Sequence, residues 1–451
     1  MALNVSDKAM SRLRWLLLPG LAAVIVTGVE WHGDRPSEPV ANAASWPKAG
    51  YGPADFAHEQ QRTADLLTLG REKVAQHPDE WLRQESLARA LINRSRLSAT
   101  YDELAEAKSV LATARREAPA GSGPLATDAV LSMMTHRLND TEAALLTMRQ
   151  MAVLEPADRS EIESLQGDVD FYRGNFSSAR QHYAMAKQVD PASDSSYRLA
   201  IVAKASGDFD GAMALFAASE PHAGRSTPYL HANYALLFGG VEMARGNYRV
   251  AREWFAKANQ TFPGYWLFEA HLAQAKALDG DLPGAIADMR QIAIKSPSAE
   301  AMDGLAMLLR VNGEAAESRQ WAARAGAIWQ HRLEQLPEAA YGHALEHELV
   351  FGSPQRALEL ARLNLASRPY GESQIYLASA LLLNGKNDEA LAQLAAAEKS
   401  GWRSAPLYAL KAQAFEFSGR QAEAEQARTA ARALNPRIFD AITPLVWFSH
   451  G

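Results

Sequence analysis

Small and aromatic residues recur at helical spacing along residues 160–191. Ala179, Tyr183 and Ala186 follow one another at i, i+4 and i+7, which places them on one face of an α-helix. A turn at Gly174 and Asn175 precedes this helix. The stretch therefore predicts two short antiparallel helices joined by a tight turn.

Two further residues fit such a helical hairpin. Gly167 is small where the first helix must approach the second, and Pro191 stands where the second helix must end. A single hairpin buries too little apolar surface to be stable alone, so the pattern predicts that the hairpin recurs.

The pattern does recur along most of the chain. The turn glycine returns at Gly174, Gly207, Gly246, Gly280, Gly313, Gly352, Gly385 and Gly419. The small residue five positions later is Ala179, Ala212, Ala251, Ala285, Ser318, Ala357, Ala390 and Ala424. The closing proline is Pro191, Pro263, Pro297, Pro369 and Pro436. Two earlier units lack the glycine and are aligned through Asp102 with Ala107, and through Asn139 with Ala144. We therefore expect ten hairpins.

These offsets resemble those of the tetratricopeptide repeat (TPR), a helical hairpin of about 34 residues marked by glycine, alanine, an aromatic residue and proline. The resemblance covers roughly Ala88 to Pro436. It departs from the family pattern where Met289, Ala322 or Leu394 replaces the aromatic residue. The resemblance implies an all-α fold, a right-handed superhelical α-solenoid with a concave groove lined by the first helix of each hairpin.

The spacing of the glycines suggests a longer period. Gly174 and Gly280 are 106 residues apart, and so are Gly246 and Gly352. We interpret this as a unit of three hairpins used three times, with a tenth hairpin at the end. Two longer steps place extra residues within His222–His231 and Ile328–Gly342, where longer helices or loops are expected. The alternative is that two insertions arose at this spacing by chance.

The N-terminal residues predict export. Lys8, Arg12 and Arg14 precede an apolar run, Trp15–Val29, so residues 1–31 form a signal peptide or an N-terminal membrane anchor. Fifteen helical residues span about 22 Å, short of a hydrocarbon core of about 30 Å, which favours a cleaved signal. A buried core helix is the remaining alternative. We expect the repeats to lie outside the cytoplasm, either periplasmic or attached to the inner membrane through residues 15–29 and facing the periplasm.

The remaining segments complete the predicted domain organisation. Residues 32–55 carry four prolines and read as a flexible linker, and residues 56–451 form the solenoid. Phe56–His77 predicts a helix that caps the array, with Leu66, Leu67, Leu69 and Val74 as its apolar stripe. Ile438–Phe448 is too apolar for a free tail, so it either folds over the last hairpin or docks a partner.

Composition excludes several classes of function. The chain has no cysteine, which rules out disulfides, thiolate zinc sites and cysteine nucleophiles. Its formal net charge is −6, and no basic stripe with interleaved aromatic residues is present, which argues against nucleic-acid binding. No phosphate-binding loop, nucleophile elbow or dinucleotide fingerprint occurs, so no cofactor is predicted.

One catalytic pattern does occur. His343, Glu346 and His347 match H-x-x-E-H, in which two histidines one helical turn apart bind zinc and the glutamate activates water. The motif also needs a third ligand, and these residues fall on the first helix of the eighth predicted hairpin. We therefore treat a zinc-dependent hydrolase as the alternative function and a non-catalytic protein as the main hypothesis.

The resemblance also implies where a partner would bind. In this family, fixed positions of the first helix face the concave groove, and carried onto this sequence they give the predicted binding residues Phe171, Tyr172, Tyr197, Lys204, Met243, Gln274, Asp303, Met307, Arg310 and Glu346. The Lys/Asn carboxylate clamp of chaperone-binding members is absent from the corresponding pairs. The sequence thus favours a non-catalytic scaffold of the cell envelope that binds a protein or an extended peptide. Solvated groove surface is the alternative for each residue, and Trp254, Trp321 and Trp402 are interpreted as packing residues.

Overall fold

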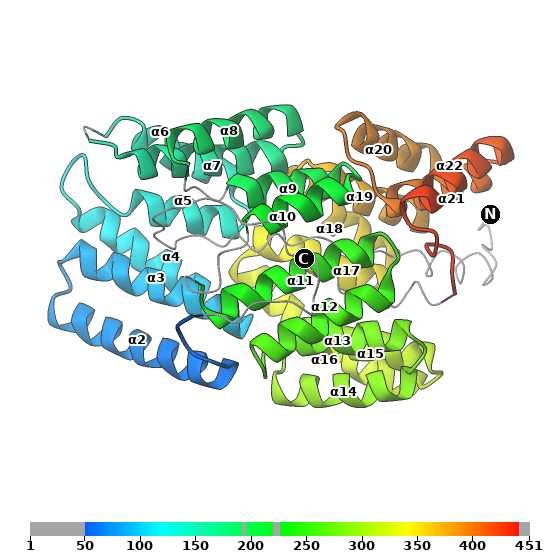
Figure 1. Cartoon of the computed structure of the whole chain (residues 1–451), viewed down its shortest axis with the longest axis horizontal. Helices are drawn as coiled ribbons and strands as arrows, with labels where there is room; N and C mark the ends of the chain where they lie inside the picture. The colour runs from blue at the N-terminus through cyan, green and yellow to red at the C-terminus, as the bar shows by residue number, and fades with distance from the viewer. Residues whose placement is uncertain (1–49, 152, 192–194, 220–225, 442–451) are drawn as a thin grey trace.

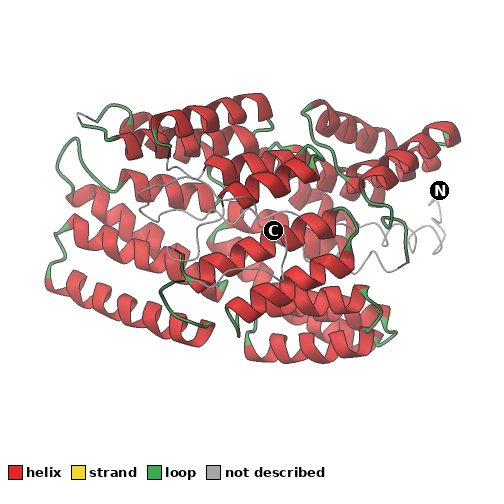
Figure 2. Ribbon diagram, in the orientation of Figure 1, coloured by secondary structure: helices red, strands yellow, loops and turns green. Residues whose placement is uncertain are grey.

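The computed structural model describes residues 50–441 except residues 152, 192–194 and 220–225. The described residues form helices joined by short turns, with no strand among them (Figure 2). A single helix, α2 (Phe56–Gln76), precedes ten consecutive helical hairpins (Figure 1). The predictions of an all-α solenoid and of ten hairpins are therefore confirmed.

The hairpins are, in order, α3 (Trp81–Ser98) with α4 (Asp102–Glu117), α5 (Leu125–Met134) with α6 (Leu138–Met148), α7 (Pro156–Tyr172) with α8 (Phe176–Val189), α9 (Ser195–Ala205) with α10 (Phe209–Ser219), α11 (Pro228–Ala244) with α12 (Tyr248–Thr261), α13 (Trp266–Leu278) with α14 (Leu282–Lys295), α15 (Ala299–Val311) with α16 (Ala315–Gln335), α17 (Pro337–Phe351) with α18 (Pro354–Ser367), α19 (Gly371–Leu383) with α20 (Asn387–Lys399), and α21 (Ala405–Phe417) with α22 (Gln421–Leu434).

The residues of the repeat pattern perform the roles that the sequence predicts. Seven of the eight turn glycines adopt a left-handed backbone, for example Gly174 at φ 79°, which favours glycine; Gly352 does not. A Cβ atom on Gly167 would lie 2.4 Å from the ring of Tyr183, so this glycine is what allows α7 and α8 to cross closely. Prolines such as Pro191 follow the second helix by two residues and prevent it from continuing.

The alignment of the second hairpin needs a correction. The predicted small residue, Ala144, is only half-buried, whereas Thr141 is fully buried. The turn residue is His136, which takes the left-handed conformation at φ 58° two residues before α6 begins, as Gly174 does before α8. The repeat alignment of the second hairpin is therefore shifted by three residues, so that His136 rather than Asn139 takes the place of the turn glycine. The sequence concealed this because a histidine occupies the position of the glycine.

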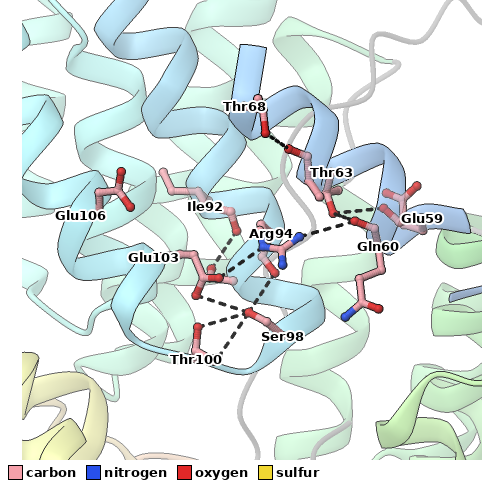
Figure 3. Close-up of polar contacts among 12 residues, drawn as sticks. Glu59, Gln60, Thr63, Thr68, Ile92, Arg94, Ser98, Thr100, Glu103 and Glu106 are labelled. Carbon is pink, nitrogen blue, oxygen red and sulfur yellow. Dashed lines mark hydrogen bonds and ion pairs between the residues drawn. The ribbon is translucent and has the colours of Figure 1, made fainter. Parts of the chain in front are cut away.

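Helix α2 packs against α3 and covers the start of the array, as predicted. Arg94 of α3 links two neighbouring elements, since its guanidinium donates to the backbone oxygen of Gln60 in α2 and pairs with Glu103 in α4 (Figure 3). The predicted apolar stripe is only partly correct. Leu67 is buried, but Leu66 and Leu69 are exposed, because α2 presents to α3 the face that carries Leu67. Phe56, at the start of α2, packs instead against Tyr265, with ring centroids 5.4 Å apart.

The C-terminal residues that the structure describes fold back over the last hairpin. Ile438 is buried against Ala405, Ala409 and Ala431 of α21 and α22. This agrees with the prediction for the beginning of the segment Ile438–Phe448. Residues 442–448 lie outside the described part of the chain, as do residues 1–49.

Hairpins far apart in the sequence also contact each other, because the superhelix coils back on itself. The turns of the first five hairpins meet the ends of hairpins seven to ten. We call these contacts the seam. Four arginines mark it: Arg332 contacts Ala99, Arg368 contacts His136, the backbone N–H of Arg403 donates to Ala205, and Arg437 lies over the ring of Tyr248.

The predicted insertion at Ile328–Gly342 contributes to the seam. Helix α16 has 21 residues, whereas α12, α14 and α18 have 14 each. Of the two predicted outcomes, a longer helix or a longer loop, the structure shows the longer helix. The added turns carry Arg332 and Gln335 to the first hairpin, where Gln335 donates to Asp102 at 2.5 Å. Of the other predicted insertion, His222–His231, residues 222–225 lie outside the described residues, and its last residues form the start of α11, which begins at Pro228.

Stacking along the array is uneven. First helices of adjacent hairpins pack against one another at most joints, as between α5 and α7 or α17 and α19. This packing is weaker between α9 and α11 and between α15 and α17, the two joints where the insertions are placed. It is also weaker between α11 and α13, where no insertion is predicted. The insertions thus coincide with altered stacking, but a three-hairpin period alone does not account for it.

Candidate functional site

The predicted binding residues lie on the first helices of hairpins three to eight, and the structure buries nearly all of them. Arg310 is half-buried, and the other nine are buried. The family pattern assigned them to the groove from their position in the repeat, which carries no information on how tightly the superhelix winds. Their role in binding a partner remains a prediction.

Phe171 and Tyr172 are covered by the chain itself. The ring of Tyr172 lies 5.1 Å from that of Tyr370 and 5.3 Å from that of Phe171. Trp402 lies 6.5 Å from Phe171 and 6.0 Å from Phe176. These five rings join the third hairpin to the start of α19 and the start of the tenth hairpin, so the interpretation of Trp402 as a packing residue is confirmed.

The next predicted residues lie on α9 and α11. Tyr197 packs against Phe216 and Tyr234, with ring centroids 5.7 and 6.3 Å apart. Met243, on α11, is also buried. Burial lowers the pKa of Lys204 to about 8, while the negative charge of Glu372 on α19 opposes this shift. Lys204 thus holds an amine of unusual acidity inside the superhelix.

A polar cluster surrounds Asp303 on α15. We define it as Glu300, Asp303, Trp329, Arg332, His343, Glu346, His347 and Tyr376. Asp303 accepts hydrogen bonds from the indole N–H of Trp329 at 2.8 Å and from Nδ1 of His347 at 2.7 Å. Burial lowers the pKa of His347, but the hydrogen bond and charge of Asp303 raise it by more, so the net shift is upward.

The same cluster contains the zinc pattern and shows what its residues contact. His343 stacks on Trp329 with ring centroids 5.6 Å apart, and its Nδ1 lies 3.3 Å from Oε2 of Glu346. The hydroxyl of Tyr376 donates to the other oxygen of Glu346. His347 is directed to Asp303 instead. Within the described ranges, no group of three or more His, Cys, Asp or Glu side chains could hold a metal ion, so the geometry gives no support to the hydrolase alternative.

Arg332 connects the polar cluster to the seam. Its guanidinium pairs with Glu300 at 2.7 Å and donates to the backbone oxygen of Ala99 at 2.6 Å. It also lies over the rings of Tyr101 and Trp329, at 4.8 and 4.6 Å. Burial raises the pKa of Glu300, but the charge and hydrogen bond of Arg332 lower it by more, so Glu300 stays ionised. The repeat pattern did not indicate Arg332, because this residue lies on an insertion.

The remaining predicted residues are held by neighbouring helices. Gln274 is buried on α13 and Met307 on α15, and the guanidinium of Arg310 donates to the backbone oxygen of Val350 on α17 at 2.9 Å. Arg310 is the predicted residue with the most accessible surface.

None of the helices in the described ranges is long and apolar enough to cross a membrane. The apolar run Trp15–Val29 is outside those ranges.

No protein-family model matches the chain, and none of the curated proteins matches it in sequence. Among solved structures, it is similar to a tetratricopeptide repeat protein from Parabacteroides merdae ATCC 43184, at 15% sequence identity over 64% of this chain and 98% of that chain, with a TM-score of 0.35. It is also similar to a chain of the APC/C hetero-tetramer Cut9-Hcn1, at 15% identity over 81% of this chain and 75% of that chain, with a TM-score of 0.38. The ten hairpins, with their left-handed turn residues and closing prolines, make the described part of this chain an all-α solenoid, consistent with tetratricopeptide repeats.

Proposed function

We propose that this protein is a non-catalytic scaffold that binds a protein or an extended peptide. The observation that carries the proposal is the array of ten stacked hairpins, an architecture that creates a long continuous surface and whose repeats mainly contact their neighbours. The proposal rests on fold-level analogy, because the fold alone does not select a reaction or a partner.

The tight winding narrows the class of partner. Hairpins one and seven touch at the seam, and the predicted binding residues of the inner helices are largely buried. A folded domain needs a broad open surface, whereas an extended peptide needs only a narrow strip of accessible surface. An extended peptide is therefore the form of partner that the architecture favours.

The place of action is the second part of the proposal. Basic residues followed by the apolar run Trp15–Val29 favour export, so we place the scaffold in the cell envelope, outside the cytoplasm. The segment either is cleaved or attaches the protein to the inner membrane. Nucleic acid and cofactors have no role in this function.

Partner capture from detergent-solubilised membranes tests the binding function. The full chain is compared with Arg310→Ala, which changes the most accessible predicted residue, and with Arg249→Ala, an exposed matched control on α12 whose side chain is 77% exposed. We expect one protein to be captured by the wild type and the control but not by Arg310→Ala. That protein must then bind the purified chain at a fixed stoichiometry. Equal capture by all three chains, or peptide hydrolysis that requires added zinc, would contradict the proposal.

A further inference from the structure

His136 occupies an unusual position at the seam. It is the turn residue of the second hairpin and holds a left-handed backbone at φ 58°. Its backbone oxygen accepts a hydrogen bond from the hydroxyl of Ser367 at 3.0 Å. Its ring Nδ1 lies 3.1 Å from the backbone oxygen of Glu338, and its Nε2 lies 3.1 Å from Nη1 of Arg368. One residue thus joins the second hairpin to both helices of the eighth.

These contacts determine the protonation state of the ring. A guanidinium only donates hydrogen bonds, so Nε2 of His136 must be the acceptor and carry no proton. A carbonyl oxygen only accepts, so Nδ1 must carry the proton and donate to Glu338. The observed geometry therefore requires the neutral imidazole. A second proton on Nε2 would place two donors and two positive charges against each other.

The surroundings of Arg368 intensify this conflict. Arg368 is buried, lies over the rings of Tyr172 and Tyr370 at 5.5 Å, and donates to Asn364 at 3.1 Å. Among the described residues no carboxylate forms an ion pair with Arg368, and its Nε has no hydrogen-bond partner. A buried cation without a counter-ion makes a second adjacent positive charge costly.

We propose that the His136–Arg368 contact is a proton-operated latch, which holds the second and eighth hairpins together at neutral pH and releases them when His136 is protonated.

The other groups that face His136 favour the same direction. The ring of Tyr172 on α7 lies 6.3 Å away and is uncharged, and His343 on α17 adds a further basic group. Arg137, the next residue, pairs with Asp140. Burial lowers the pKa of His136 well below 6.5, the charges of Arg368 and His343 lower it further, and only the hydrogen bond to Glu338 opposes them.

The sign of the pH dependence follows from this shift. Above pH 6.5 the ring is neutral in both the closed and the open seam, so pH has no effect. Below pH 6.5 the open seam binds a proton that the closed seam refuses, and each pH unit then favours opening by up to about tenfold. The latch therefore weakens on acidification.

The absence of cysteine allows a direct measurement. Spin labels on cysteines replacing the exposed residues Ala143 on α6 and Ala366 on α18 report the distance between the two hairpins. In the otherwise wild-type chain we expect one short distance at pH 8 and a growing longer population below pH 6.5. His136→Asn, which tolerates a left-handed backbone and does not titrate, should abolish this change. His58→Asn, on an exposed histidine, is the matched control and should leave it intact.

A second variant is needed if the seam of His136→Asn is open at every pH, because that variant then shows no pH response to compare. Arg368→Gln removes the charge, and its amide can donate to a neutral imidazole or accept from a protonated one. The proposal then requires the response of Arg368→Gln to acid to be clearly smaller than that of the wild type. An acid response equal to wild type in Arg368→Gln or in His136→Asn would overturn the proposal. So would an unchanged wild-type distance down to the pH at which the helices unfold.

Discussion

Arg332 donates a hydrogen bond to the backbone oxygen of Ala99, a residue 233 positions earlier in the chain. The donor lies on the extended end of α16, and the acceptor lies in the turn of the first hairpin, where Ala99 adopts a left-handed backbone at φ 55°. This contact shows that the superhelix is braced between its turns as well as between neighbouring hairpins. In an open solenoid, stability is close to a sum of neighbouring interfaces, and the seam adds a long-range contribution.

Replacing Arg332 should destabilise the array. Arg332→Ala leaves Glu300, whose side chain is 12% exposed, without its partner, and breaking a largely buried ion pair in this way costs about 3–5 kcal/mol. Urea unfolding should show this loss, and amide exchange should show faster opening of the first hairpin turn. Arg249→Ala breaks an exposed pair with Glu253 and should cost at most about 1 kcal/mol. Equal losses in the two variants would show that the seam contributes nothing.

Gly167 should tolerate no side chain. In Gly167→Ala, the added methyl group would overlap the ring of Tyr183, so α7 and α8 must separate, at a cost of about 1–3 kcal/mol. Thermal unfolding measures this cost. Adding Tyr183→Leu should recover part of the loss, because the smaller side chain leaves room for the methyl group. No recovery in the double variant would mean that the two helices are not limited by this contact.

The local part of the structure could be predicted from sequence, and the seam could not. Gly174, Ala179 and Tyr183 are separated by a few residues, so the helical period alone shows that they share one hairpin. Arg332 and Arg368 are ordinary residues near helix ends, and nothing in their spacing indicates the turns that they contact. Burial of the predicted binding residues depends on that winding, which explains why the repeat pattern assigned their helices but not their surroundings.

The His347–Asp303 pair should stabilise the fold most at acidic pH. The pKa of His347 is raised above 6.5 in the folded chain, so its contribution is fully present below pH 6.5 and is lost as the pH rises through the folded value. Unfolding of the wild type and of His347→Gln should therefore differ more at pH 6 than at pH 9. His331→Gln, at a 60% exposed side chain on α16, is the control. A difference that grows with pH would contradict this assignment.

The H-x-x-E-H pattern should not create a zinc enzyme. We expect the purified protein to contain less than one zinc per chain, since His343 and His347 are engaged by Glu346 and Asp303 rather than directed to a common point. Metal analysis by mass spectrometry measures this directly. A chelator should leave the unfolding temperature unchanged. One tightly held zinc per chain, lost in His343→Ala, together with a peptidase activity, would restore the hydrolase hypothesis.

Export can be tested with a reporter that is active only outside the cytoplasm. Joined after Phe448, it should be active with the full chain and inactive when residues 1–31 are removed, because those residues carry the basic and apolar signal. Activity of a cytoplasm-only reporter at the same position would contradict the predicted localisation.

The central claim is that the superhelix closes on itself, and cysteine trapping tests it most directly. Asp102 and His331 are exposed residues of the first and seventh hairpins whose side chains lie 3.6 Å apart, and the chain has no other cysteine to interfere. In Asp102→Cys/His331→Cys, mild oxidation should cross-link the two positions rapidly, whereas Asp102→Cys with Arg324→Cys, about two helical turns earlier in α16 than His331, should react far more slowly. Equal and slow cross-linking of both pairs would show that the turns of the superhelix do not meet.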